Sequence, residues 1–112
     1  MSQPLVPAYG TSTLSDLLPS VGAVLGLPGR ENVLKLPEAE RFVVLLVDGL
    51  GWHLLEGREA LAPFLCELRT RARPITSGVP STTATSVTSL GTGLTPGQHG
   101  IAGYTFRYSG GL

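Results

Sequence analysis

Six consecutive apolar residues, 42–47 with the sequence Phe-Val-Val-Leu-Leu-Val, constrain the fold of this chain more than any other feature. A short, valine-rich run of this kind is typical of a strand that is buried on both faces. Each such side chain contributes on the order of 1.5–3 kcal/mol when it is buried. The run therefore predicts the central strand of a sheet. Asp48-Gly49-Leu50-Gly51 follows directly and predicts a tight turn, because glycine adopts backbone angles that other residues avoid.

Before this run, the sequence predicts one helix and one short strand. Leucine and valine recur at helical spacing over residues 14–25. Ser15 is a candidate cap for this helix, and Pro19 suits its first turn. Residues 33–36, Val-Leu-Lys-Leu, are interpreted as a short edge strand.

After the run, the elements continue in the order helix, strand, helix. Residues 59–72 predict a helix with arginines in its last turn, and residues 74–76 predict a second strand. The hydroxyl-rich stretch over residues 81–90 follows and is helical only if its hydroxyls are satisfied; Gly91 and Gly93 mark its end. This order predicts an α/β fold with a mostly parallel sheet and flanking helices.

Composition limits the class of protein and its partners. The 112 residues suit one domain, and an apolar fraction of 42% is that of a globular chain. The formal net charge of zero gives no attraction for nucleic acid or an anionic membrane, so neither partner is expected. Cys66 is the single cysteine, no signal peptide is recognised, and no apolar run approaches the roughly 20 residues of a membrane span. We therefore expect a cytoplasmic protein; its oligomeric state is left open.

Asp48 is the first candidate for chemistry. Ligands and reactive groups in open α/β sheets gather beyond the carboxyl ends of the strands, and Asp48 follows the predicted central strand directly. A carboxylate held there suits a metal ion. The alternative is that Asp48 only begins a turn or caps the next helix.

The second candidate is the hydroxyl-rich segment. Seven of the nine residues from Ser81 to Ser89 are serine or threonine, too many for a core-facing helix chosen on propensity. At a helix start, unpaired backbone N–H groups favour an anion such as phosphate. A threonine hydroxyl is a weak nucleophile at neutral pH, so a threonine here would need activation, most simply by a metal ion. The alternative is an ordinary serine- or threonine-capped helix.

The two histidines and the glycine-rich segment give weaker evidence for a functional site. His99 is more simply a structural hydrogen-bonding residue than a metal ligand, and His53 is interpreted as a surface residue or one that supports a site from outside. The glycines of residues 91–100 match neither phosphate-binding fingerprint, and no G-x-S-x-G elbow is present.

Three ordered motifs together resemble the type I phosphodiesterase/nucleotide pyrophosphatase branch of the alkaline phosphatase superfamily. They are Val-Val-Leu-Leu-Val-Asp-Gly-Leu-Gly at residues 43–51, Pro-Ser-Thr-Thr-Ala-Thr-Ser at 80–86 and Thr-Gly-Leu-Thr-Pro-Gly-Gln-His-Gly-Ile at 92–101. The resemblance implies that residues 1–112 are the N-terminal part of one alkaline-phosphatase-like domain, with part of its sheet. The chain stops before the family's remaining zinc ligands, so we expect a chain truncated at its C-terminus and inactive by itself.

The resemblance also implies the site. In that family the strand-end aspartate, here Asp48, binds one of two zinc ions, and the nucleophilic threonine, here Thr83, is activated by the ion that Asp48 holds. The backbone N–H of Ala84 would stabilise the developing charge, and Ser86 stands where the family has a phosphate-binding asparagine. The implied substrate is a small-molecule phosphate ester or nucleotide.

The sequence departs from the family pattern after the nucleophile, where Ala84, Thr85 and Ser86 replace an aromatic residue, a proline and the asparagine. Two alternatives therefore stay open. One is a phosphomonoesterase or another hydrolase of the superfamily. The other is a non-catalytic fragment that binds an anion or a partner.

Overall fold

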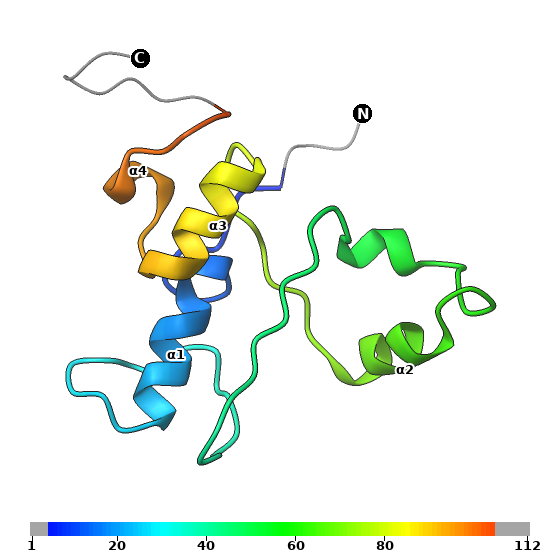
Figure 1. Ribbon diagram of the computed structural model, residues 1–112, viewed down its shortest axis with the longest axis horizontal. Coiled ribbons are helices and arrows are strands. Elements are labelled where there is room, and N and C mark those ends of the chain that lie inside the picture. The colour runs from blue at the N-terminus through cyan, green and yellow to red at the C-terminus, as the bar shows by residue number, and fades with distance from the viewer. Residues whose placement is uncertain (1–4, 105–112) are drawn as a thin grey trace. The chain divides into compact units, whose positions relative to one another are not determined.

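The computed structural model describes residues 5–104, and its regular elements are all helical (Figure 1). They are the 3-10 helices η1 (Leu14–Asp16) and η2 (Trp52–Leu55) and the helices α1 (Leu17–Val24), α2 (Pro63–Arg71), α3 (Thr83–Thr92) and α4 (Pro96–His99). The chain forms two compact units. The first unit comprises Met1–Val43 and Ile75–Leu112, and the second comprises Val44–Pro74.

The prediction of an α/β fold with a mostly parallel sheet is wrong. Among the described residues, the only β pairing is one isolated parallel bridge between Thr13 and Thr76. The strand expected at residues 74–76 is reduced to this bridge. The edge strand expected at 33–36 is a loop, because the Asn32 side chain takes the place of a strand partner: its Nδ2 donates to the Leu36 carbonyl at 2.8 Å and its Oδ1 accepts from the Leu36 N–H at 2.9 Å.

The apolar run at residues 42–47 is the largest departure from prediction. Its exposure alternates along the chain, with Val43 at 95% and Leu45 at 84% against 40% for Val44 and 45% for Leu46. The run makes no hydrogen bond to any described residue. A strand needs neighbours that pair its backbone and cover its faces, and the described part of the chain provides neither.

In the first unit, the predicted helix at 14–25 is confirmed as η1 followed by α1. The chain turns into it at Thr13, whose backbone N–H and hydroxyl both donate to the Asp16 carboxylate at 2.8 Å. The cap is therefore the Thr13–Asp16 pair rather than Ser15. Pro19 lies in the first turn of α1, as predicted, where its missing N–H costs no helical hydrogen bond.

Helix α3 confirms the prediction of a hydroxyl-rich helix, and it packs beside η1 and α1 (Figure 1). Thr85 and Ser89 on its inner face are fully buried. On the outer turns, Thr88 and Thr92 each donate to the carbonyl four residues earlier at 2.7 Å. The small side chains of this helix thus satisfy their own hydroxyls while the inner face approaches its neighbours closely.

Helix α3 ends at Gly93, which adopts a left-handed conformation with φ of 69°. Gly91, the other predicted end, lies within the helix. A Cβ added at Gly93 would stand 2.6 Å from the Pro19 Cγ. This glycine therefore serves both the turn and the contact between α3 and α1.

We predict that Gly93→Ala destabilises the first unit by about 2–5 kcal/mol. Left-handed backbone at a residue with a Cβ costs roughly 1–2 kcal/mol, and overpacking adds about 1–3 kcal/mol. The matched control is Gly100→Ala, because Gly100 ends α4 at φ of 77° and has nothing within 4 Å of an added Cβ. Denaturant unfolding followed by circular dichroism measures both. Equal losses of stability in the two variants would contradict the Pro19 contact.

The second unit contains η2 and α2. Helix α2 begins at Pro63, four residues later than residue 59 from the sequence prediction, and ends at Arg71. Proline suits the first position of a helix, where its N–H would have no partner. Arg69 and Arg71 lie in the last turn, as predicted, where positive charge is favourable. Over the described residues, no helix is long and apolar enough to cross a membrane.

Candidate functional site

Asp48 lies in the second unit, in an exposed turn with Gly49 that joins the apolar run to η2. Gly49 has φ of 72°, so the predicted tight turn is confirmed. The N-cap of η2 is Gly51, so Asp48 is not the cap of that helix. The carboxylate is thus presented at the surface on a defined turn.

The start of α3 distinguishes between two adjacent threonines. Thr82 is the N-cap and is buried; its Oγ1 accepts from the Thr85 N–H at 3.3 Å and donates to the Thr85 Oγ1 at 2.9 Å. Thr83 is the first residue of the helix and is exposed. The hydroxyl of Thr82 is therefore engaged in the cap, and Thr83 presents the accessible surface.

Ala84 and Ser86 share the first turns of α3 with Thr83, and both are half-buried. The Ser86 N–H donates to the Thr82 carbonyl at 2.9 Å within the helix. The Ala84 N–H makes no hydrogen bond to a described residue. Because the first N–H groups of a helix lack helical partners and carry its positive end, this position suits an anion.

Of the residues predicted for the site, the structure groups Thr83, Ala84 and Ser86 on one helix in the first unit. Asp48 belongs to the other unit. The grouping on α3 follows from sequence spacing alone, since residues three and four apart share a helix face.

His99 at the end of α4 is held as a structural residue. Its Nδ1 accepts from the Ile101 N–H at 3.0 Å, and its Nε2 lies 2.9 Å from the Ser89 Oγ. An Nδ1 that accepts a hydrogen bond carries no proton, so the proton is on Nε2 and is donated to Ser89. With both nitrogens engaged, His99 ties α4 to α3, in agreement with the structural interpretation of the sequence.

His53, in contrast, is exposed in the second unit, where its Nδ1 lies 2.9 Å from the Glu56 Oε1. This position agrees with its interpretation as a surface residue.

The donor set of the described residues does not fit a complete two-metal site. No group of three or more histidine, cysteine, aspartate or glutamate side chains in residues 5–104 is arranged to hold a metal ion. A zinc ion in a protein takes four ligands, of which at least three come from the protein. Asp48 is a single carboxylate, and Thr83 adds a hydroxyl from the other unit.

Sequence reasoning missed three residues that organise this region: Thr82, Thr85 and Ser89. The signal for Thr82 was available, because threonine is a preferred N-cap and accepts from the N–H three residues on. The roles of Thr85 and Ser89 depend on partners from other elements, which spacing within the helix does not reveal.

Comparison with known families now identifies the chain. The family model for type I phosphodiesterase / nucleotide pyrophosphatase matches residues 42–111, more than half of the 112-residue chain. No curated protein and no solved structure matches the chain. The chain belongs to the type I phosphodiesterase/nucleotide pyrophosphatase family.

Membership places the chain among hydrolases of phosphate esters, a family that depends on metal ions. The resemblance stated from the three sequence motifs is thereby confirmed. The matched region contains both Asp48 and the start of α3.

We predict that Thr82→Ala lowers the free energy of unfolding by about 1 kcal/mol, the usual effect of losing an N-cap. Thr83→Ala is the matched control one residue away. It changes stability less than Thr82→Ala does, because Thr83 is exposed and is not the N-cap, and substitutions of exposed residues usually change stability by about 0.5 kcal/mol or less. Urea unfolding of the two variants measures the difference. A larger loss for Thr83→Ala would assign the cap, and not the surface position, to Thr83.

Proposed function

We propose that this chain carries the nucleophile of a phosphate-ester hydrolase and that Thr83 is that nucleophile. One observation favours Thr83 over Thr82 as the nucleophile. The hydroxyl of Thr82 forms the hydrogen bonds of the N-cap, whereas Thr83 is exposed at the first position of α3, beside the N–H of Ala84. The proposed reaction is hydrolysis of a phosphodiester or a nucleotide pyrophosphate bond.

In the proposed reaction, the Thr83 Oγ1 attacks phosphorus while the bond from phosphorus to the departing oxygen breaks; this oxygen belongs to an alcohol in a phosphodiester and to a second phosphate in a pyrophosphate. The Thr83 hydroxyl proton passes to a base, and the departing oxygen gains a proton from solvent. Water then cleaves the phosphothreonine and restores the hydroxyl. The Ala84 N–H and the positive end of α3 stabilise negative charge on the non-bridging oxygens. Ser86, one turn along the helix, is proposed as a further phosphate contact.

We propose Asp48 as one ligand of the metal site on which the family depends, with two zinc ions as the expected complement. Because the described residues supply so few of the ligands that two zinc ions need, the remaining ligands are proposed to come from further polypeptide of a larger catalytic domain. Residues 1–112 are then its N-terminal part. The small phosphate-containing substrate is proposed from the family.

The phosphate-binding part of the proposal has a direct test. Inorganic phosphate added to the 112-residue chain shifts the backbone amide signal of Ala84 in a saturable manner and more than that of Thr85, because the Ala84 N–H lies at the anion-favouring end of α3 whereas the Thr85 N–H donates to the Thr82 hydroxyl. The amide of Ala23, far along α1, serves as the internal reference. Nuclear magnetic resonance titration at low ionic strength gives the measurement. Equal, non-saturating shifts at all three amides would contradict an anion site at α3.

The proposed metal site leads to a separate prediction. The 112-residue chain binds zinc weakly, below two ions per chain, and cleaves bis-p-nitrophenyl phosphate no faster than buffer. Isothermal titration calorimetry and p-nitrophenol absorbance measure the two quantities. Tight binding of two zinc ions would show that the ligand set is complete. Cleavage that disappears in Thr83→Ala would support the nucleophile and refute the need for further ligands. Cleavage unchanged in Thr83→Ala would refute the nucleophile.

A further inference from the structure

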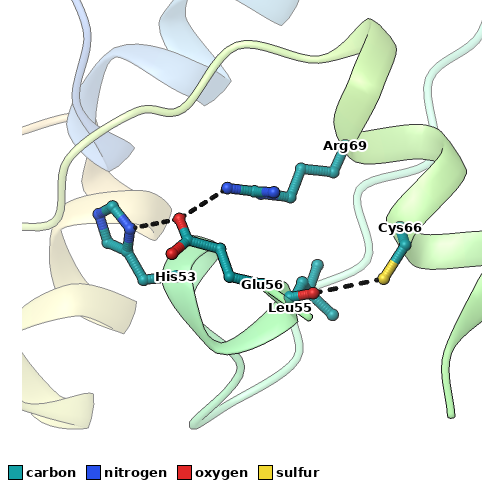
Figure 2. Close-up of polar contacts among 5 residues, drawn as sticks. All are labelled: His53, Leu55, Glu56, Cys66 and Arg69. Carbon is teal, nitrogen blue, oxygen red and sulfur yellow. Dashed lines mark hydrogen bonds and ion pairs between the residues drawn. The ribbon is translucent and has the colours of Figure 1, made fainter. Parts of the chain in front are cut away.

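Within the second unit, η2 and α2 are joined by a set of polar and cation–π contacts that we call the clasp: Trp52, His53, Glu56 and Arg69. The Glu56 Oε1 accepts from the Arg69 Nη2 at 2.7 Å and pairs with the His53 Nδ1 at 2.9 Å (Figure 2). The Arg69 guanidinium lies over the Trp52 ring, 4.9 Å from its centroid. One arginine of α2 thus contacts both ends of the η2 segment.

Apolar burial adds little to this connection. In Val44–Pro74, all of which the structure describes, Cys66 is the one buried residue. Its Sγ donates to the Leu55 carbonyl at 3.4 Å, so the thiol lies against the last residue of η2 (Figure 2). Large apolar side chains of the same unit, such as Leu61 and Phe64, are exposed at 79% and 69%. A segment with so few buried apolar contacts opens locally at a small free-energy cost.

We propose that the clasp is a conformational latch: its contacts, rather than apolar packing, hold η2 on α2 and cover Cys66. Two groups face the Glu56 carboxylate, His53 from η2 and Arg69 from α2. When the clasp opens, the segment from η2 to the start of α2 separates from Arg69 and the thiol becomes accessible.

The latch is sensitive to acid. The hydrogen bond from His53, together with the positive charges of His53 and Arg69, lowers the pKa of Glu56 below its ordinary value. A carboxyl whose pKa is lowered on folding stabilises the folded form above its ordinary pKa, and this contribution is lost as the pH falls through the lowered value. Acid therefore opens the latch.

The latch also restrains the polypeptide after Asp48, since η2 begins at Trp52 and only three residues separate the two. This consequence for a metal ligand rests on the proposed function, whereas the latch itself does not. A failure of the latch experiment would leave the assignments of Asp48 and Thr83 untouched.

The single cysteine makes the latch measurable. A pyridyl disulfide reacts with an accessible thiol by exchange: the thiol sulfur bonds to one sulfur of the reagent, the other leaves as a thiopyridine that absorbs light, and the thiol proton is released. We expect Glu56→Gln to raise the reaction rate of Cys66 about two- to fivefold, the range that corresponds to loss of an exposed ion pair. The helical circular dichroism should stay unchanged.

Glu67→Gln is the matched control. Glu67 pairs with Arg71 inside α2, four residues away, so it carries the same type of charge pair without joining two elements. In the Glu67→Gln variant, Cys66 should react at the same rate as in the unmodified chain. Equal rates in the two variants, whether raised or unchanged, would overturn the latch.

A second measurement needs no substitution and so does not depend on how a variant folds. The rate at which Cys66 of the unmodified chain reacts with the pyridyl disulfide is divided, at each pH, by the rate for N-acetylcysteine. As the pH falls, this ratio should rise before the helical circular dichroism is lost. The fluorescence of Trp52, the one tryptophan, should change over the same range. A ratio that stays flat until the helices unfold would refute the proposal.

Discussion

The packing of hydroxyl side chains between α3 and the η1–α1 segment is the interaction on which the first unit depends. Thr13, Ser20, Thr85 and Ser89 are almost completely buried, whereas few large apolar residues are. Small side chains let helices approach closely, but each buried hydroxyl needs a hydrogen-bond partner. Ser20 accepts from the Leu34 N–H, and Ser89 pairs with His99. The first unit is thus built on small, buried side chains with specific hydrogen-bond partners rather than on a large apolar core.

This packing decides which hydroxyls remain at the surface. Thr82 and Thr85 lie three residues apart and share the inner face of α3, where they bond to each other. Thr83 lies between them and therefore faces outward. The same register that buries one threonine exposes its neighbour beside the N–H groups at the helix start. The proposed chemistry at Thr83 is a consequence of how α3 packs.

The second unit is organised differently, by charge pairs and one aromatic stack at its surface. Contacts of this kind are weak individually and sensitive to pH and salt. The apolar run before Asp48, whose residues would each contribute substantially on burial, stays largely exposed.

The sequence by itself determined the local elements and the family. Periodicity and proline predicted the helix over residues 14–25, and Gly91 and Gly93 predicted the region where α3 ends, although the structure decided between the two glycines. Three short motifs in order identified the phosphodiesterase family, because such motifs depend on neighbouring residues. Only the tertiary structure decided the pairing of distant segments. The run at 42–47 has the composition of a buried strand, but a sheet requires partners that no local pattern supplies. The engagement of Thr82, and of His99 with Ser89, likewise depended on contacts across elements.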